Sequence, residues 1–264
     1  MEQKQLHEIA GKLADAEANK RPIPSLSSTY PDLTLKDAYQ IQWFNAARTL
    51  ASGRRLVGYK IGLTSREAQK HFQVFEPDYG HLFDSMCLNE GTQFDLTQLI
   101  QAKIEGEIAF VLGRDLQGPG VTIADVIRAV DFVTASLEII DSRIENWKIS
   151  SKDTIADNGS SARFVLSSKR CSLGNLDLAS LGMALSCNGE VRMTGAGGAV
   201  LGNPLLSIVF LANELGKSGK ALVVGETILS GALSGMLNMR PGESYRCEIA
   251  QLGDVGIRVK GGAA

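Results

Sequence analysis

The sequence predicts an α+β fold, in which a small N-terminal helical region precedes a mixed, curled β-sheet or barrel. The first 54 residues carry apolar side chains at helical spacing, whereas the remainder has many short strand patterns, few helices and glycine-rich turns. A glycine-rich stretch at 195–202 follows a hairpin pattern and has Val200 where the G-x-G-x-x-G motif requires glycine. We therefore expect a barrel-like sheet rather than a Rossmann layer.

The composition is that of an ordinary globular protein. The chain has 264 residues, of which 44% are hydrophobic and 21% charged, with a net charge of -2. This charge gives no electrostatic reason to expect binding to nucleic acid or to an anionic membrane. The polar N-terminus is unlike a signal peptide, and no apolar run reaches the roughly 18 residues of a membrane span. The cysteines form no CxxC pair, so we expect idle thiols in a reducing cytoplasm rather than a zinc site or disulfides: Cys87, Cys171, Cys187 and Cys247.

Two helices are expected in the N-terminal region. Apolar residues recur at helical spacing from about residue 3 to 20, and a proline-containing segment follows. Residues 25–33 are expected to form a loop. A second helix begins at Thr34, where Asp37 completes an acidic variant of the capping box. We expect these helices to pack as a cap, and we assign them no chemistry.

A strand is expected at residues 55–62, with Lys60 inside its apolar pattern. Either an exposed lysine on an edge strand or a buried functional lysine fits this pattern. Thr64 and Ser65 then cap a short helix beginning near Arg66. The N-terminus of such a helix can hold a carboxylate or phosphate group.

The clearest chemical signal lies on a strand predicted over residues 103–112. Side chains alternate across a strand, so Glu105 and Glu107 point to one face. Burying two carboxylates without a partner is costly, and a hard divalent cation such as Mg²⁺ or Mn²⁺ would remove that cost. A half-exposed strand with its polar face in water is the alternative. Glu138 supplies a third acid within a second apolar run at 133–141, which favours a metal site.

Two polar segments are further candidates. The segment Glu76–Gly80 has the composition of a turn, and its Asp78 is either ordinary turn chemistry or a functional acid. Residues 153–161 combine hydroxyl, amide and acidic side chains with small residues. They either bring backbone N–H groups and Ser160 to a ligand or form a surface loop.

The C-terminal third is expected to be rich in strands. Residues 183–193 read as a hairpin with Asn188-Gly189 as its two-residue turn. A helix is expected from Pro204 to about residue 216, and another from Thr122. Further strands are expected near 223–230, 244–250 and 254–259.

Five stretches, in their order and spacing, resemble one family. The chain resembles the 2-keto-4-pentenoate hydratase / 4-oxalocrotonate decarboxylase family of the fumarylacetoacetate hydrolase superfamily over nearly its whole length. The resemblance implies a fumarylacetoacetate hydrolase-like fold, with a helical cap at 1–54 and a catalytic domain at 55–264, assembled as a homo-oligomer. The stretches are Gly58–Ser65, Glu76–Gly80, Lys103–Ala109, Leu137–Arg143 and Asp153–Ser160.

The resemblance also implies a role for individual residues. The implied metal ligands, for Mg²⁺ or Mn²⁺, are Glu105, Glu107 and Glu138. The implied catalytic residues are Lys60 and Asp78, and the candidate substrate contacts are Thr64, Asp157, Asn158 and Ser160. Lys60 would perform acid–base work if burial and the metal lower its pKa. The chain departs from the family at Gly159, where alanine commonly follows the asparagine.

The activity implied by the resemblance is metal-dependent hydration of 2-hydroxypenta-2,4-dienoate to 4-hydroxy-2-oxopentanoate, in meta-cleavage aromatic catabolism. One alternative is decarboxylation of 4-oxalocrotonate. Another is hydration of a longer 2-oxo-enedioate, with Arg143 or Arg163 binding the second carboxylate. A third is an inactive partner in a complex with a neighbouring pathway enzyme, but the intact lysine and glutamates argue against it. In each active case the partner is a small molecule rather than nucleic acid or membrane.

Overall fold

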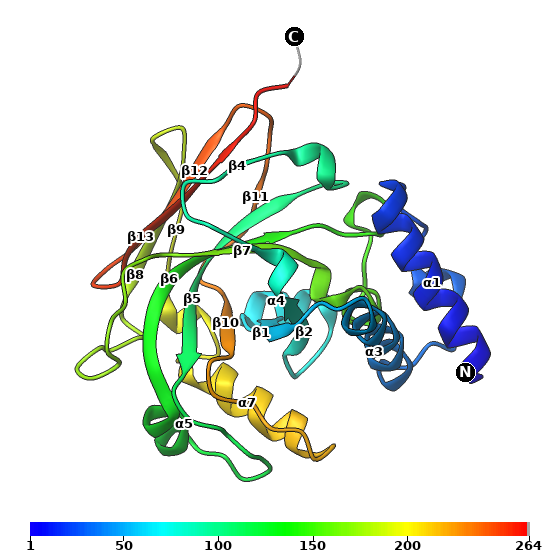
Figure 1. Ribbon diagram of the computed structural model, residues 1–264, viewed down its shortest axis with the longest axis horizontal. Helices are drawn as coiled ribbons and strands as arrows, with labels where there is room; N and C mark the ends of the chain where they lie inside the picture. Colours follow the sequence, from blue (N-terminus) through cyan, green and yellow to red (C-terminus); the bar gives the residue numbers. More distant parts are fainter. Residues whose placement is uncertain (263–264) are drawn as a thin grey trace.

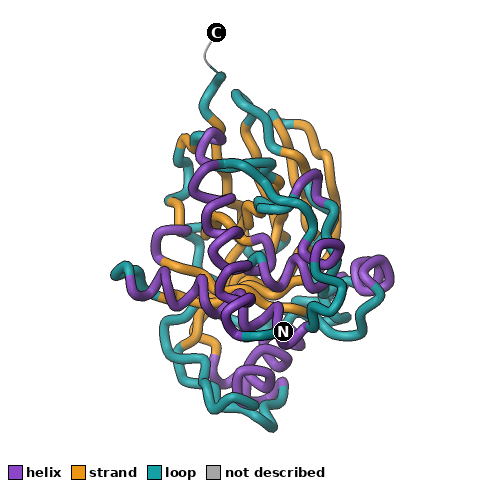
Figure 2. Tube along the Cα trace, turned by 90° about the vertical axis from the view of Figure 1, so that its right-hand side faces the viewer, coloured by secondary structure: helices purple, strands orange, loops and turns teal. Residues whose placement is uncertain are grey.

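The computed structural model describes residues 1–262 and has the predicted α+β architecture (Figure 1). A large mixed sheet curls around the centre of the molecule, a second sheet packs against it, and a helical layer lies along one side (Figures 1 and 2). The last two residues of the predicted catalytic domain, 263–264, lie outside the described residues.

The N-terminal layer consists of α1 (Gln3–Asn19), α2 (Leu26–Thr29) and α3 (Leu35–Ala51). The predicted capping box is present, since Thr34 and Asp37 bond each other's backbone N–H at the start of α3. The predicted loop at 25–33 is wrong in part, because it contains α2, a single helical turn capped by Ser25. The three helices share a hydrophobic cluster with body residues such as Ile144 and Ile155, so they are anchored to the body.

The large sheet is mixed, because two of its strand pairs are parallel and the others antiparallel. Lys60 lies on β1, which has a neighbouring strand on each side, so the edge-lysine alternative is wrong. In spatial order the strands are β2 (Asp78–Phe83), β1 (Leu56–Gly62), β10 (Thr227–Ala232), β5 (Lys103–Leu112), β6 (Val130–Ile140), β7 (Ser161–Leu166) and β3 (Cys87–Leu88), with β11 (Leu237–Asn238) paired to β5.

The second sheet contains the predicted hairpin, with Asn188 and Gly189 both at positive φ in its turn. It packs on the back of β5, where Gly106 faces the core. A Cβ at Gly106 would lie 2.6 Å from Cys247 Sγ, so only glycine permits this approach. In spatial order its strands are β4 (Gln93–Phe94), β13 (Gly253–Val259), β12 (Ser244–Ile249), β8 (Gly182–Cys187) and β9 (Glu190–Ala196).

Four further helices each lie between two strands in the chain. They are α4 (Arg66–Phe72), α5 (Ile123–Ala129), α6 (Ser151–Ala156) and α7 (Leu205–Gly216), with short 3₁₀ turns at Asp84–Met86, Leu96–Gln98, Glu145–Trp147, Asn158–Ser160 and Gly197–Ala199. Two predictions need correction here. Residues 153–161 begin in α6 and are buried, so they are not a surface loop. Asp78 opens strand β2 instead of lying in a turn.

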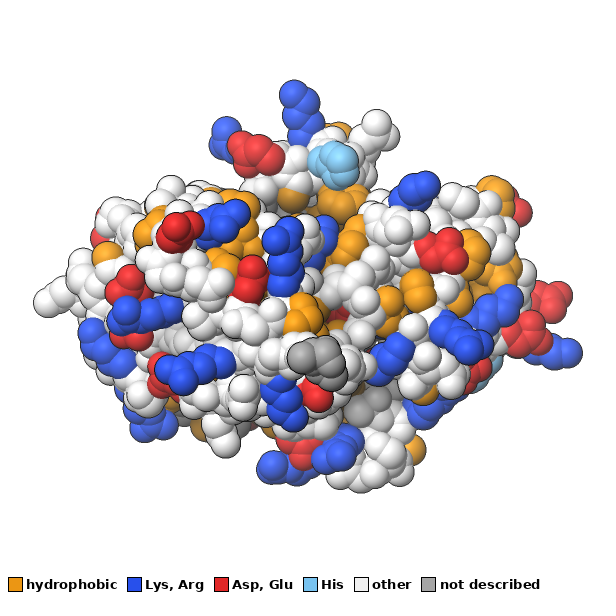
Figure 3. Space-filling model, turned by 90° about the horizontal axis from the view of Figure 1, so that it is seen from above, with side chains coloured by type: hydrophobic (Ala, Val, Ile, Leu, Met, Phe, Trp, Pro, Cys, Tyr) orange, Lys and Arg blue, Asp and Glu red, His pale blue; other side chains and the backbone are white. Residues whose placement is uncertain are grey.

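The surface carries charges of both signs. Figure 3 shows acidic and basic side chains interspersed over the face seen from above. Within residues 1–262, no helix is long and apolar enough to cross a membrane.

Candidate active site

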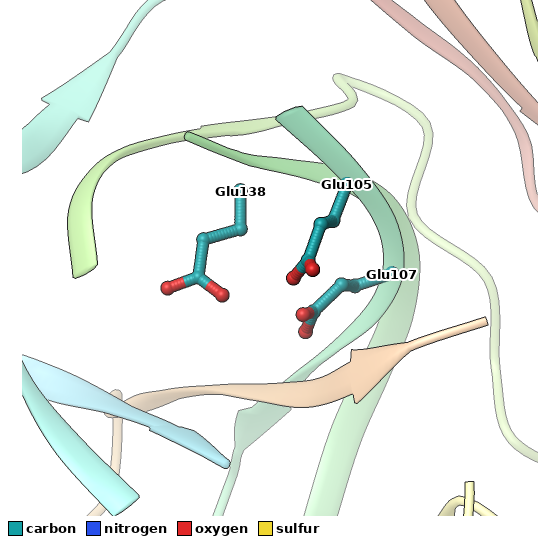
Figure 4. A group of neighbouring side chains, drawn as sticks. All are labelled: Glu105, Glu107 and Glu138. Atoms are coloured by element: carbon teal, nitrogen blue, oxygen red, sulfur yellow. The ribbon is translucent and has the colours of Figure 1, made fainter. Parts of the chain in front are cut away.

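Three glutamates gather on the inner face of the large sheet. Glu105 and Glu107 project from the same face of β5, and Glu138 lies directly opposite Glu105 on β6. One carboxylate oxygen from each lies within 4.8 Å of the others, and the side chains turn toward a common space (Figure 4). Glu105 is 8% exposed, Glu107 1% and Glu138 0%. The strand alternation that predicted this face is therefore confirmed, and the half-exposed alternative is wrong.

Few of these carboxylate oxygens accept a hydrogen bond from the protein. Glu107 Oε2 accepts the Gly231 N–H at 2.8 Å, but Glu107 Oε1 and both Glu138 oxygens accept no hydrogen bond from a described residue. Burial, reinforced by Glu138, raises the pKa of Glu105 to about 7, although Lys60 opposes the rise. Burial, Glu138 and Glu105 also raise the pKa of Glu107. Three unsatisfied oxygen ligands within one small space fit a hard divalent cation.

Lys60 reaches into the same space from β1. Its Nζ donates to the Gly159 carbonyl at 3.0 Å and lies 3.1 Å from Glu138 Oε2, in an ion pair without hydrogen-bond geometry. Burial alone would lower the Lys60 pKa, but the surrounding carboxylates, led by Glu138, raise it above its usual value. The protein groups by themselves therefore do not lower the Lys60 pKa as expected. A divalent cation among the carboxylates would oppose their effect.

Asp78 approaches from β2, beside Lys60. It is 2% exposed, and neither carboxylate oxygen has a hydrogen-bond partner among the described residues. Burial raises its pKa to about 6, although Lys60 acts in the opposite direction. A Cβ at Gly62 would lie 2.3 Å from Asp78 Oδ1, so glycine makes room for the carboxylate. Asp78 is thus a buried acid that is poised to exchange a proton near neutral pH.

The segment after α6 forms the wall beside Lys60. The Asn158 side chain bonds both the N–H and the carbonyl of His81, at 2.7 and 2.9 Å. Gly159 has φ +61°, and a Cβ there would lie 2.9 Å from Lys60 Cδ. Ser160 Oγ donates to Asp157 Oδ2 at 3.3 Å. These bonds hold the Gly159 carbonyl against the lysine.

A cavity of about 370 Å³ opens beside these groups. It includes five of the predicted site residues, Lys60, Thr64, Asp78, Glu105 and Ser160. Its other walls are largely apolar and come from α4, β6, the segment around Trp147 and the segment from Ala232 to Met236. The other four predicted site residues do not line this cavity: Glu107, Glu138, Asp157 and Asn158. The side chains of Asp157 and Asn158 bond Arg143 and His81 instead.

Sequence reasoning assigned no site role to most of the cavity wall, including Lys103 and Trp147. Lys103 shares the face of Glu105 on β5, so the same alternation could have found it. Trp147 lies on a 3₁₀ turn between β6 and α6, and no local pattern placed it near the cavity. Both side chains are half-buried, whereas the three glutamates are buried.

Arg143 and Arg163 lie away from this cavity. The Arg143 guanidinium is buried and pairs with Asp157, with Nε donating to Oδ1 at 2.5 Å. Arg143 and Arg163 both line a second cavity of about 270 Å³, between the N-terminal helices and β7. The suggestion that either arginine binds a second substrate carboxylate is therefore not supported by their positions.

Comparisons with known proteins agree with this geometry. Residues 60–260 match the family model described as "Fumarylacetoacetate (FAA) hydrolase C-terminal". The chain is 46% identical over 97% of its length, and 95% of the relative's, to a 2-keto-4-pentenoate hydratase from Paraburkholderia xenovorans. It is 39% identical, over 95% of both chains, to a 4-oxalocrotonate decarboxylase from Pseudomonas sp. CF600. A solved 4-oxalocrotonate decarboxylase from Pseudomonas putida G7, with magnesium and adipate, superposes with a TM-score of 0.95 at 38% identity and 98% coverage of each chain.

Proposed function

Because the chain belongs to the fumarylacetoacetate hydrolase family, in its hydratase and decarboxylase branch, we propose that it hydrates 2-hydroxypenta-2,4-dienoate to 4-hydroxy-2-oxopentanoate. It is an enzyme of the lyase type. The observation that carries the proposal is the meeting of three buried glutamates, Lys60 and Asp78 beside one cavity. The 46% identical hydratase favours hydration over other chemistry.

The proposed cofactor is Mg²⁺ or Mn²⁺, held by Glu105, Glu107 and Glu138. The unsatisfied oxygens of these residues are the hard ligands that such cations prefer. When bound, the cation supplies Lewis-acid stabilisation of negative charge on the substrate's 2-oxygen. The Gly231 N–H fixes the Glu107 carboxylate, so this ligand is oriented before the cation arrives.

The proposed acid–base residues are Lys60 and Asp78. Hydration requires the 2-hydroxyl to lose its proton while C5 of the dienol gains one, after which water adds its hydroxyl at C4 and a proton at C3. Lys60, held by the Gly159 carbonyl and Glu138, delivers and recovers protons at the substrate. Asp78, with two unpartnered oxygens, holds the water and accepts its proton. Ser160 and Thr64 orient the substrate carboxylate, whereas Asp157 and Asn158 position the Gly159–Ser160 turn.

A second candidate is decarboxylation of 4-oxalocrotonate. Its support is the solved decarboxylase that superposes over 98% of both chains. A cation held by the three glutamates would stabilise negative charge on the 2-oxygen in both reactions, since each passes through a dienolate. The same site therefore permits either outcome, and the substrate decides between them.

The proposal extends to the setting of the enzyme. Residues 1–54 act as a cap that supports the site from behind, and residues from 55 onward carry the chemistry. We propose that the enzyme works in the cytoplasm as a homo-oligomer, in meta-cleavage aromatic catabolism, and that it associates with a neighbouring pathway enzyme. Sedimentation of the purified protein tests the oligomer directly.

A split assay tests the function. One sample contains 2-hydroxypenta-2,4-dienoate, followed by loss of its ultraviolet absorbance, and the other contains 4-oxalocrotonate, followed by CO₂ release. Each is run with Mg²⁺ and with EDTA. EDTA-sensitive loss in the first sample alone supports hydration, and CO₂ in the second alone would replace it with decarboxylation. Glu105→Gln should abolish turnover without unfolding the protein, and Glu226→Gln, a buried glutamate outside the cluster, should retain it.

A further inference from the structure

A second cavity lies behind the turn at residues 157–161. Gly159 and Ser160 line the active-site cavity. Asp157 and Asn158, on the same turn, line the cavity of about 270 Å³ between the N-terminal helices and β7. The two cavities share no lining residue. The turn therefore forms part of the wall of two separate spaces, and a ligand of the second would not compete with the substrate for contacts.

Arg163 gives the second cavity a cationic group that the protein leaves without a counter-ion. The side chain is half-buried, and within residues 1–262 it forms no ion pair. Its Nη1 donates to the carbonyl of Ala162, another lining residue, at 2.7 Å. Burial lowers the pKa of Arg163, although Glu17 and Asp141 oppose the fall. The guanidinium has thus lost part of its hydration without gaining a carboxylate partner.

Two buried polar atoms in the lining also lack a partner. Ser161 is 4% exposed, and its Oγ forms no hydrogen bond with a described residue. The Oδ1 atom of Asn45 is buried and equally unpartnered. Both residues line the second cavity together with Arg163. Because a buried polar atom without a partner is costly, these groups indicate that the cavity receives a polar ligand.

The other charged groups of the lining set the charge that this ligand should carry. Arg143 and Asp157 form a buried ion pair and neutralise each other. Arg48 and Glu17 are exposed and have opposite signs. Arg163 is the charge that remains, so the cavity favours a single negative charge. Apolar side chains complete the lining and would receive a short hydrocarbon tail; they include Leu13, Ala46, Phe83 and Met86.

We propose that the second cavity is a binding site for a small monocarboxylate with a short apolar tail, held by the Arg163 guanidinium and the Ser161 hydroxyl. A planar guanidinium can bind a carboxylate through two parallel hydrogen bonds. Loss of such a charge-assisted contact lowers affinity by about 10- to 100-fold. Because the ligand lies against residues 157–161, it also restrains the Gly159 carbonyl, which accepts a hydrogen bond from Lys60.

NMR titration with butyrate and butyramide tests this inference without turnover. The two probes have nearly the same shape, but only butyrate carries a charge. Both are titrated in EDTA, so that no divalent cation is present at the glutamate cluster. We expect wild-type protein to bind butyrate at least 10-fold more tightly than butyramide. Arg163→Gln should bring this affinity ratio close to one, Arg163→Lys should restore part of it, and Ser161→Ala should weaken butyrate binding several-fold.

A matched control and a second measurement locate the site. Arg163 and Arg170 both lie over an aromatic ring, that of Phe94 and that of Phe132, but Arg170 does not line the cavity. Arg170→Gln should therefore leave the affinity ratio unchanged. Butyrate should also slow hydrogen exchange of the backbone amides at 157–161 in wild-type protein, and should not do so in Arg163→Gln.

Other results would overturn the inference. They are a wild-type protein that binds both probes equally or neither, an unchanged ratio in Arg163→Gln, and protection from exchange that excludes residues 157–161. If Arg163→Gln does not fold, the exposed Glu17→Gln decides, because removing this nearby negative charge should tighten butyrate binding and an unchanged affinity would contradict the site. A protein that binds butyrate as expected but does not hydrate the dienoate would refute the hydration proposal alone.

Discussion

Replacement of Glu107 by glutamine separates two effects of the carboxylate cluster: its repulsion, which destabilises the fold, and its binding of a cation. Two like-charged neighbours lie within 4.8 Å of Glu107, and each pair contributes about 3.5 kcal/mol of gross repulsion at an effective dielectric of about 20. Lys60 offsets part of this repulsion. Glutamine removes the charge and can still accept the Gly231 N–H. Glu107→Gln should therefore stabilise the protein in EDTA and abolish its stabilisation by Mg²⁺.

The pH dependence gives the prediction its sign and size. The folded-state pKa of Glu107 is raised, so the folded state binds more protons than the unfolded state above pH 4.5. Wild-type stability therefore falls as the pH rises, by at most about 1.4 kcal/mol per pH unit, and the variant lacks this loss. In EDTA at pH 7.5 we expect the variant to be more stable by about 2–4 kcal/mol, or roughly 6–12 °C in Tm. At pH 5 the gain should be below about 1 kcal/mol.

Thermal unfolding at both pH values, with EDTA and with a Mg²⁺ titration, measures this difference. Wild-type protein should gain about 2.7 kcal/mol at a Mg²⁺ concentration 100 times its Kd. Glu226→Gln is the matched control, because that buried carboxylate also accepts a backbone N–H, at 2.8 Å, but lies outside the cluster. A Glu107→Gln protein that is less stable than wild type in EDTA at pH 7.5 would refute the reasoning. So would a variant that keeps the full Mg²⁺ shift.

Three other substitutions test separate parts of the account. Lys60→Met should lower kcat by at least about 10²-fold with the protein still folded in Mg²⁺, and steady-state kinetics that match wild type would remove Lys60 from the chemistry. Burial lowers the pKa of His81 to about 4, so the unfolded state binds more protons between pH 4 and 6.5 and stability falls as the pH drops. His81→Phe should therefore lose about 2 kcal/mol less than wild type between pH 7 and pH 5 in urea unfolding, and equal losses would contradict this. Asp157→Asn leaves the buried Arg143 guanidinium without its charge partner and should cost about 3–5 kcal/mol in the same assay, whereas a cost below 1 kcal/mol would mean that the pair is not structural.

Local patterns predicted the parts of the fold that depend on local chemistry. The Asn188-Gly189 hairpin and the Thr34 capping box follow from short-range backbone and side-chain requirements, and both are present. Strand alternation placed Glu105 and Glu107 on one face, because the period of two is a property of the strand itself.

Features that depend on tertiary packing could not be predicted from the sequence alone. The pairing of β1 with both β2 and β10 buries Lys60, and nothing within residues 55–62 specifies those neighbours. Burial also explains why Arg143 is unavailable, since its partner Asp157 is fourteen residues away in the chain. Trp147 enters the cavity wall through a strained turn that composition does not reveal.

The most direct test of the central claim is a crystal structure with Mn²⁺ and 2-oxoadipate, with the ion located by anomalous scattering. The account predicts one strong peak per chain, with an oxygen of each of Glu105, Glu107 and Glu138 at about 2.0–2.3 Å. The 2-oxo acid head should lie beside that peak, near Lys60 and Asp78. A peak elsewhere, or none in saturating Mn²⁺, would contradict the assignment of these glutamates as a metal site.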